Sequence, residues 1–147
     1  MTEHACNYSL LDHTADLGVI VRGGNLLNLF INAGQALISL MIVSLKAQNK
    51  VPQEPTSISV SISGHDLEDL MVRWLGEILY LFEGENLVVT EIDIPLFFNF
   101  TLHAILKIVP FNPELHRVLR EIKAVTYHQI EVAPKDDYWT ARVIFDL

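Results

Sequence analysis

Two segments of this sequence repeat apolar residues at the spacing of an α-helix, and they restrict the possible fold more than any other feature. In residues 27–42 and 66–82, apolar side chains recur every three or four positions, so each segment predicts a helix with one buried face. Asn25 precedes the first segment and Asp66 opens the second, where each can cap a first turn. Gly84 can end the second helix in a left-handed conformation. A helix with a wide apolar face must pack against another layer of structure.

That second layer is predicted to be a β-sheet. Residues 57–63 alternate strictly between serine and an apolar residue, which is typical of a strand with one buried face. Further strands are expected at residues 8–11, 17–22, 87–94, 99–109, 124–132 and 139–146, with loops at 44–56 and 110–116. Consecutive hairpins favour antiparallel pairing. The predicted fold class is therefore α+β: a two-layer, mainly antiparallel (mixed) sheet with two long helices packed on one face, in a single domain spanning residues 1–147.

Composition excludes several classes of function. Half of the residues are hydrophobic, which fits a packed core, but no apolar run is long enough for a membrane span. The formal net charge of −8 disfavours a phosphate backbone as partner, so no direct stable nucleic-acid binding is expected. The start of the chain lacks the features of a signal peptide and Cys6 is the single cysteine, so we expect a cytoplasmic protein without disulfides.

Acidic residues gather near both ends of the sequence. The segment Asp12-His13-Thr14-Ala15-Asp16 separates two short predicted strands, and Asp146 precedes the terminal residue Leu147. On residue types alone, two interpretations stay open. The aspartates can bond to turn amides while the chain end is simply solvated. Alternatively, the two ends meet, and their oxygen atoms hold a hard cation such as Ca²⁺ or Mg²⁺.

The segment Glu121–His128 is the third candidate for chemistry. Lys123 leads into a predicted strand that contains His128. A lone histidine in a strand is usually structural, and a lone lysine usually extends into solvent. The sequence has no nucleophile elbow, phosphate-cradling glycine loop or cysteine–histidine set with zinc spacing.

Taken together, these segments resemble the archease family over nearly the whole chain and in the same order. The resemblance rests on Leu11-Asp12-His13-Thr14-Ala15-Asp16-Leu17-Gly18, on the helix segments around Asn32-Ala33 and Trp74-Leu75, on Glu121–His128, and on the ending Phe145-Asp146-Leu147. Three features depart from the family pattern. Arg73 stands where an acid or amide is common, Gly76 replaces a polar helix former, and the first turn Leu26-Leu27-Asn28 lacks the usual acids. All three departures concern only what the helix surfaces contact.

The resemblance implies a function that composition could not show. Archeases are non-enzymatic activators of the RtcB-type RNA ligase, which uses GTP to guanylylate itself during tRNA splicing; the GTP is used by the ligase and is not bound by the archease alone. Carried onto this sequence, the family's divalent-cation ligands are Asp16, Asp146 and Leu147, with Ca²⁺ expected and Mg²⁺ or Mn²⁺ as alternatives. Lys123, His13 and His128 match motif positions expected to serve activation or partner contact. The role of Asp12 stays open, either as an acid near the cation or as a turn residue.

Two other classes of function remain as alternatives. One is a chaperone-like protein-binding module that uses the helix surfaces and residues 110–116. The other is a metal-dependent phosphoesterase with His13 or His128 as general base.

Overall fold

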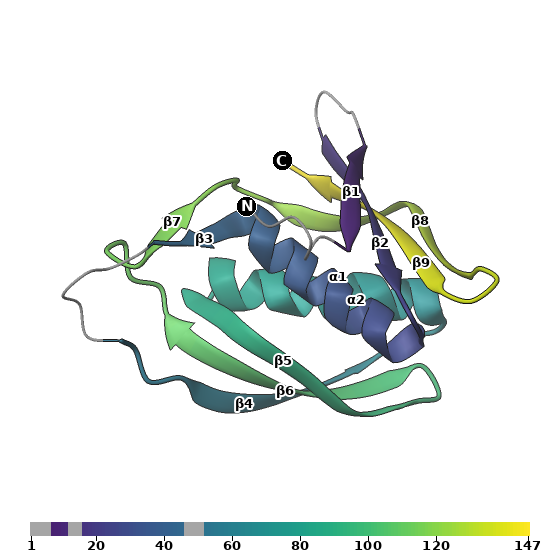
Figure 1. Cartoon of the computed structure of the whole chain (residues 1–147), viewed down its shortest axis with the longest axis horizontal. Coiled ribbons are helices and arrows are strands. Elements are labelled where there is room, and N and C mark those ends of the chain that lie inside the picture. Colours follow the sequence, from purple (N-terminus) through teal and green to yellow (C-terminus); the bar gives the residue numbers. More distant parts are fainter. Residues whose placement is uncertain (1–6, 12–15, 46–51) are drawn as a thin grey trace.

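The polypeptide forms two long helices and nine strands within the residues that the structure describes (Figure 1). The computed structural model describes residues 7–11, 16–45 and 52–147. In chain order the elements are β1 (Tyr8–Leu11), β2 (Asp16–Gly23), α1 (Leu26–Met41), β3 (Ile42–Ser44), β4 (Thr56–Ser63), α2 (Leu67–Glu83), β5 (Leu87–Phe98), β6 (Thr101–Pro110), β7 (His116–Val118), β8 (Ala124–Pro134) and β9 (Trp139–Asp146).

Both predicted helices are present and both begin at the predicted caps. The side chain of Asn25 accepts a hydrogen bond from the amide of Asn28, and Asp66 accepts one from the amide of Asp69. The predicted end of α2 is wrong in its detail. Gly84 has a right-handed φ of −93°, and Asn86, with φ 58°, takes the left-handed position. Asparagine tolerates this region because its short side chain can hydrogen-bond locally.

The strands form three sheets, and every strand pairing in the described residues is antiparallel. The largest sheet has the order β1-β2-β9-β8, and a second has the order β4-β6-β5. The third sheet pairs β3 with β7, two short strands inside or beside the segments predicted as loops. These two strands were not predicted, because three residues are too few to show an alternation pattern and prolines in the adjoining segments indicate loops.

The core lies where the two helices meet the two larger sheets. Figure 1 shows α1 and α2 between the sheet that contains β2, β8 and β9 and the sheet that contains β4, β5 and β6, and both helices contact strands of both sheets. At the centre, Trp74 is fully buried and its Nε1 donates a hydrogen bond to the carbonyl of Phe30 at 2.8 Å. The expected fold class, α+β with a mainly antiparallel sheet and two long helices, is confirmed. No helix of the described residues is long and apolar enough to cross a membrane.

Candidate functional site

The two acidic segments near the ends of the sequence meet at one edge of the four-stranded sheet. Asp16 opens β2 and Asp146 closes β9, and the antiparallel register places these residues directly opposite each other. Directly opposed residues point to the same face of a sheet with their Cβ atoms about 4.5–5.5 Å apart. Asp16 is half-buried and Asp146 is exposed. The expectation that Asp16 and Asp146 lie together is confirmed by this register.

Lys123 lies on the other side of Asp146. Its backbone amide donates a 2.8 Å hydrogen bond to the carbonyl of Asp146, and Ala124 is the register partner of Asp146 on β8. Lys123 is exposed, as is the terminal residue Leu147. Four of the residues singled out in the sequence, Asp16, Lys123, Asp146 and Leu147, therefore come together at this corner, which we call the acidic corner.

His128 stands a short distance along β8, in an irregular stretch. The register between β8 and β9 shifts between Thr126 and Glu131, and Gln129 has a left-handed φ of 54°. Thr126 holds the start of this bulge, because its Oγ1 donates to the carbonyl of Ile144 at 2.8 Å and accepts from the amide of His128 at 3.3 Å. The side chain of His128 is exposed. Bulges of this kind redirect side chains and are common beside functional sites.

The other predicted site residues fall outside the part of the chain that the structure describes: these are Asp12 and His13. Within the described ranges, no group of three or more His, Cys, Asp or Glu side chains is arranged to hold a metal ion. The acidic corner therefore provides two carboxylate side chains, with the backbone oxygen of Leu147 next to them in the chain. An oxygen-only donor set of this kind fits a hard divalent cation rather than zinc or copper.

A second polar cluster ties β8 to the start of α2. The hydroxyl of Tyr127 donates a 2.6 Å hydrogen bond to Oδ1 of Asp69, a carboxylate that is 8% exposed. The amide of His65 donates to the other oxygen of Asp69 at 2.9 Å, and Nε of Arg73 contacts both oxygens at 3.0–3.1 Å. Donation from Tyr127, followed by that from the His65 amide, lowers the pKa of Asp69 to about 2.

Sequence reasoning missed this cluster. Asp69 lies in the first turn of α2, where an acidic residue is favourable without any distant partner, and nothing in the sequence around Tyr127 indicates one. The pKa of Tyr127 is raised in turn, first because its proton is held by the Asp69 carboxylate. The contact fixes one end of the bulge that carries His128 to helix α2.

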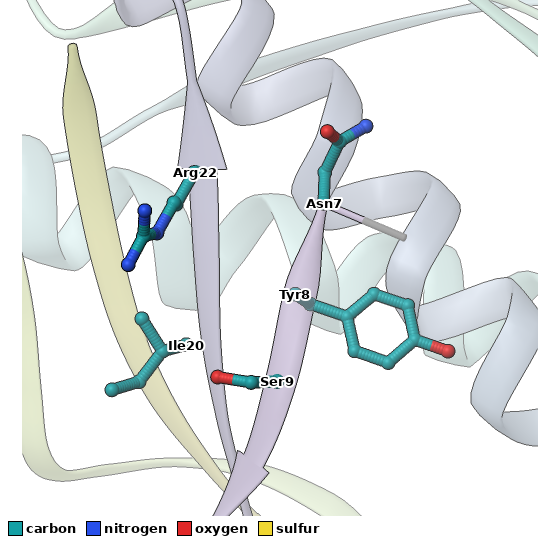
Figure 2. A pocket seen from close by; sticks show the side chains of 5 residues that line it. All are labelled: Asn7, Tyr8, Ser9, Ile20 and Arg22. Carbon is teal, nitrogen blue, oxygen red and sulfur yellow. The ribbon is translucent and has the colours of Figure 1, made fainter. Parts of the chain in front are cut away.

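A groove crosses the outer face of the four-stranded sheet, the face opposite the helices. Asn7, Tyr8, Ser9, Ile20 and Arg22 line a hollow of about 300 Å³. Figure 2 shows Arg22 and Ile20 projecting from β2 to the same side, with Ser9 of β1 turned toward them and the Tyr8 ring turned away.

An adjoining hollow of about 220 Å³ shares Ile20 and Arg22 with the first and adds Lys135 and Arg142. We call the two together the outer groove.

Cations gather in the outer groove although the chain as a whole is acidic. Arg22 lies 5.4 Å from the centre of the Tyr138 ring, and Nε of Arg142 donates to the carbonyl of Gln129. Glu131 is the register partner of Arg142, yet no ion pair joins the two side chains. Because side chains alternate along a strand, Arg22 and Arg142 share the outer face with Asp16 and Asp146. The groove begins roughly 13 Å, or four residues, from the acidic corner.

Comparison with known proteins finds relatives along the whole chain. A family model described as the archease protein family matches residues 8–147. The protein archease of Methanosarcina acetivorans is 32% identical over 151 residues, which cover 100% of each chain. That of Sulfolobus acidocaldarius is 30% identical over 95% of this chain and 98% of its own.

Solved structures share the fold. A solution structure of protein 1598 from Methanobacterium thermoautotrophicum is 26% identical, covers 96% of this chain and 99% of its own, and has a TM-score of 0.70. A crystal structure from Thermotoga maritima, described as an archease and possible chaperone, is 20% identical with a TM-score of 0.62 over 93% of this chain and 94% of its own. The second likeness shows the fold alone.

Proposed function

Because this chain belongs to the archease family, we propose that it is a non-enzymatic activator of an RtcB-type RNA ligase. In this proposal it acts in the cytosol during tRNA splicing, where it promotes guanylylation of the ligase and repeated turnover. The ligase binds and uses the GTP, and the present chain supplies the acidic corner to the ligase rather than sealing RNA itself.

The observation that carries the proposal is the direct pairing of Asp16 with Asp146. Two like charges placed opposite each other across a strand pair destabilise a sheet, unless a cation or hydrogen-bond donors compensate. A cation shared by the two carboxylates is one such compensation, and it is the one that we propose here. The same pairing supports the ligand positions that the family resemblance implies.

In this proposal the carboxylates of Asp16 and Asp146 and a backbone oxygen of Leu147 hold one divalent cation, which is Ca²⁺ in the first place, with Mg²⁺ or Mn²⁺ as alternatives. When bound, the cation supplies positive charge that can neutralise charge developing on phosphate oxygens. Lys123 stands beside the pair through its backbone bond to Asp146. In this proposal the exposed Lys123 steers a phosphate or an acidic side chain of the ligase toward the corner, and exposed His128 extends the same contact surface.

The outer face is the surface that we propose to contact the ligase. It combines the acidic corner with the guanidinium groups of Arg22 and Arg142, so its charge pattern can fix the orientation of a partner with the opposite arrangement.

A guanylylation assay with the partner ligase tests the proposal. Asp16→Asn and Asp146→Asn should each abolish most of the activation, whereas Asp93→Asn, an exposed aspartate on β5, should leave it intact. The purified chain alone should not hydrolyse phosphate esters. Full activation by both corner variants would refute the proposal, and phosphate ester hydrolysis lost in Asp16→Asn would favour the phosphoesterase alternative.

A second candidate function, a protein-binding module, is favoured by one observation. The tip of the β5–β6 hairpin exposes three large apolar side chains, those of Leu96, Phe98 and Phe100. Phe100 is held there with a left-handed φ of 54°, a conformation that is costly for an aromatic residue. Replacing Phe98 and Phe100 with serine should abolish binding of the ligase or another client if this tip is the contact. Such binding would also be insensitive to chelators, unlike activation through the acidic corner.

A further inference from the structure

Strand β4 forms an unprotected edge of the three-stranded sheet. In the order β4-β6-β5, β4 pairs with β6 alone within the described residues, and Figure 1 shows it as the outermost strand of that sheet. Natural edge strands are usually blunted by charged residues, prolines or bulges, because a free row of amides and carbonyls invites another strand. β4 has no charged residue and no proline between Thr56 and Ser63, and its register with β6 is unbroken. The β5 edge differs, since Pro95 and two register shifts interrupt it.

The sequence of this edge is symmetric. Ser57-Ile58-Ser59-Val60-Ser61-Ile62-Ser63 reads the same in both directions about Val60. An antiparallel pair of identical strands is related by a two-fold axis, so each residue faces the position at the same distance beyond the axis. With the axis at Val60, each Ile58 faces Ile62 of the other copy and each Ser59 faces Ser61. Every cross-strand pair is then either apolar with apolar or serine with serine.

We propose that a second copy of this chain binds along β4, with the two-fold axis at Val60, so that the two three-stranded sheets join into one sheet of six strands. The proposal does not depend on the function proposed above. The two copies would associate through β4 alone and in this one register.

The partial burial of the apolar side chains of β4 supports binding of a second copy. The apolar side chains of Ile58, Val60 and Ile62 are only half-buried, whereas the facing positions on β6, Ala104 and Leu106 among them, are almost completely buried. A second β4 would place the same apolar row beside them and remove more of this surface from water. The serine row on the opposite side of β4 is exposed and already forms contacts with β6, such as Ser61 with His103 and Ser63 with Thr101.

The chain also leaves room beside the edge. A hollow of about 350 Å³ lies between the end of β4 and the flank of α2, where Arg73, Gly76 and Glu77 complete its lining. A Cβ atom added at Gly76 would meet nothing within 4 Å. The helix flank therefore does not cover the β4 edge, and the incoming strand has space to approach it.

Such a dimer leaves the candidate site free. Figure 1 places β4 on the far side of the helices from β2 and β9, which carry the acidic corner. Because the two-fold axis of an antiparallel strand pair is perpendicular to the sheet, both copies would carry their helices on the same face of the joined sheet, and each would keep its own acidic corner. The expected result of dimerisation is bivalent display of the site, without contact between the two sites.

Sedimentation velocity over a concentration series, from micromolar to millimolar, tests the association. The wild-type chain should show a reversible shift from monomer to dimer. The double variant Ser59→Lys/Ser61→Lys places like charges opposite each other at both symmetric pairs, and should weaken the dimer about tenfold or more. The matched double variant Ser59→Glu/Ser61→Lys changes the same positions but pairs opposite charges across the axis, so it should dimerise at least as well as wild type.

A cysteine experiment fixes the register. In a Cys6→Ser background, Val60→Cys should form a disulfide-linked dimer under mild oxidation, because position 60 faces its own copy at a Cα distance of about 4.5–5.5 Å. Ile62→Cys should not, because position 62 faces position 58. A wild-type chain that remains monomeric at millimolar concentration would overturn the proposal. So would equal behaviour of the two charge variants, or equal cross-linking of the two cysteine variants, once circular dichroism has shown that each variant is folded.

Discussion

Asp69 is a carboxylate whose pKa departs clearly from its ordinary value. Its pKa of about 2, against 3.8 for the free side chain, means that the charged form is favoured in the folded chain by Tyr127, the His65 amide and Arg73. A carboxylate with a lowered folded-state pKa adds stability that is fully present above its unfolded pKa. We therefore expect this contribution to be present above about pH 4, and to be lost as the pH falls from 3.8 toward 2.

Unfolding by urea at pH values from 5 to 2 measures this contribution. Asp69→Asn should lower the free energy of unfolding at pH 5 and flatten its fall between pH 4 and 2, and Tyr127→Phe should do the same to a smaller extent. Asp93→Asn, at an exposed position on β5, serves as the control and should follow wild type. Parallel curves for wild type and Asp69→Asn across this range would contradict the assignment.

The aspartates of the acidic corner should differ from Asp69, because they are expected to stabilise the fold only when a cation is bound. A divalent cation that binds only the folded chain stabilises it by about 2.7 kcal/mol at one hundred times its Kd. For a chain of this size, the corresponding rise in Tm is roughly 5–10 °C. Ca²⁺ should raise the Tm of wild type in this way but not that of Asp146→Asn.

In the presence of a chelator, Asp146→Asn should be at least as stable as wild type, because the charge facing Asp16 has been removed. Equal Ca²⁺ shifts in both proteins would exclude Asp146 as a ligand.

The sequence was sufficient to predict part of the site. Residue types alone left open whether Asp16 and Asp146 meet, and the family resemblance predicted that they do; the register of β2 with β9 places them opposite each other. The cluster of Asp69, Arg73 and Tyr127 could not be predicted, since the hydrogen bond joins residues 58 positions apart and depends on how α2 packs on β8. The outer groove was hidden for the same reason: its cations come from separate strands and a turn, so they form no run along the sequence.

At the scale of elements, the two interior helix glycines offer a matched test of packing. Gly34 lies in α1, where an added Cβ would come within 2.7 Å of Cδ1 of Ile92 and 2.9 Å of Cδ1 of Ile78. Gly76 lies in α2 with open space around its Cα. Glycine costs about 0.5–1 kcal/mol relative to alanine inside a helix. Gly76→Ala should therefore raise the free energy of unfolding by about that amount.

The same substitution at Gly34 should have the opposite sign. Overpacking a filled core typically costs about 1–3 kcal/mol, which exceeds the gain in helix propensity. Urea denaturation of both variants at micromolar concentration, where self-association through β4 contributes least, gives the comparison. Stabilisation by Gly34→Ala would show that Ile78 and Ile92 move apart at little cost, which the close packing of this helix contact argues against.

Helices were predicted more accurately than strands, and particular residues show why. The predicted and observed helices differ by a residue at each end, because Asn25 and Asp66 mark the first turns through side-chain bonds that are local in sequence. Strands β3 and β7 depend on each other, with Ile42 opposite Val118, and neither has a signal of its own. The bulge in β8 follows from pairing with β9 and from the left-handed Gln129, so sequence alternation alone could not locate it.

For the molecule as a whole, the arrangement separates two surfaces by the helical layer. The four-stranded sheet carries both signs of charge on its outer face, and the three-stranded sheet ends in the uncharged edge β4 on the other side of the helices. A net charge of −8 would repel an acidic partner or RNA at long range, so an anionic group of the partner can approach only where cations gather. The outer groove is such a place, beside the corner that is proposed to meet the ligase.

This arrangement predicts how binding to the ligase depends on salt. Exposed charge pairs are worth about 0.2–1 kcal/mol each and act mainly on the association rate. The double variant Arg22→Gln/Arg142→Gln should therefore slow association with the ligase by roughly three- to tenfold at low ionic strength. At high ionic strength, screening should bring the variant and wild type together. Arg117→Gln, which removes an exposed charge on β7, is the matched control and should change neither rate nor salt dependence. Stopped-flow measurement across a salt series distinguishes this from a loss of folding, which would slow association equally at every ionic strength.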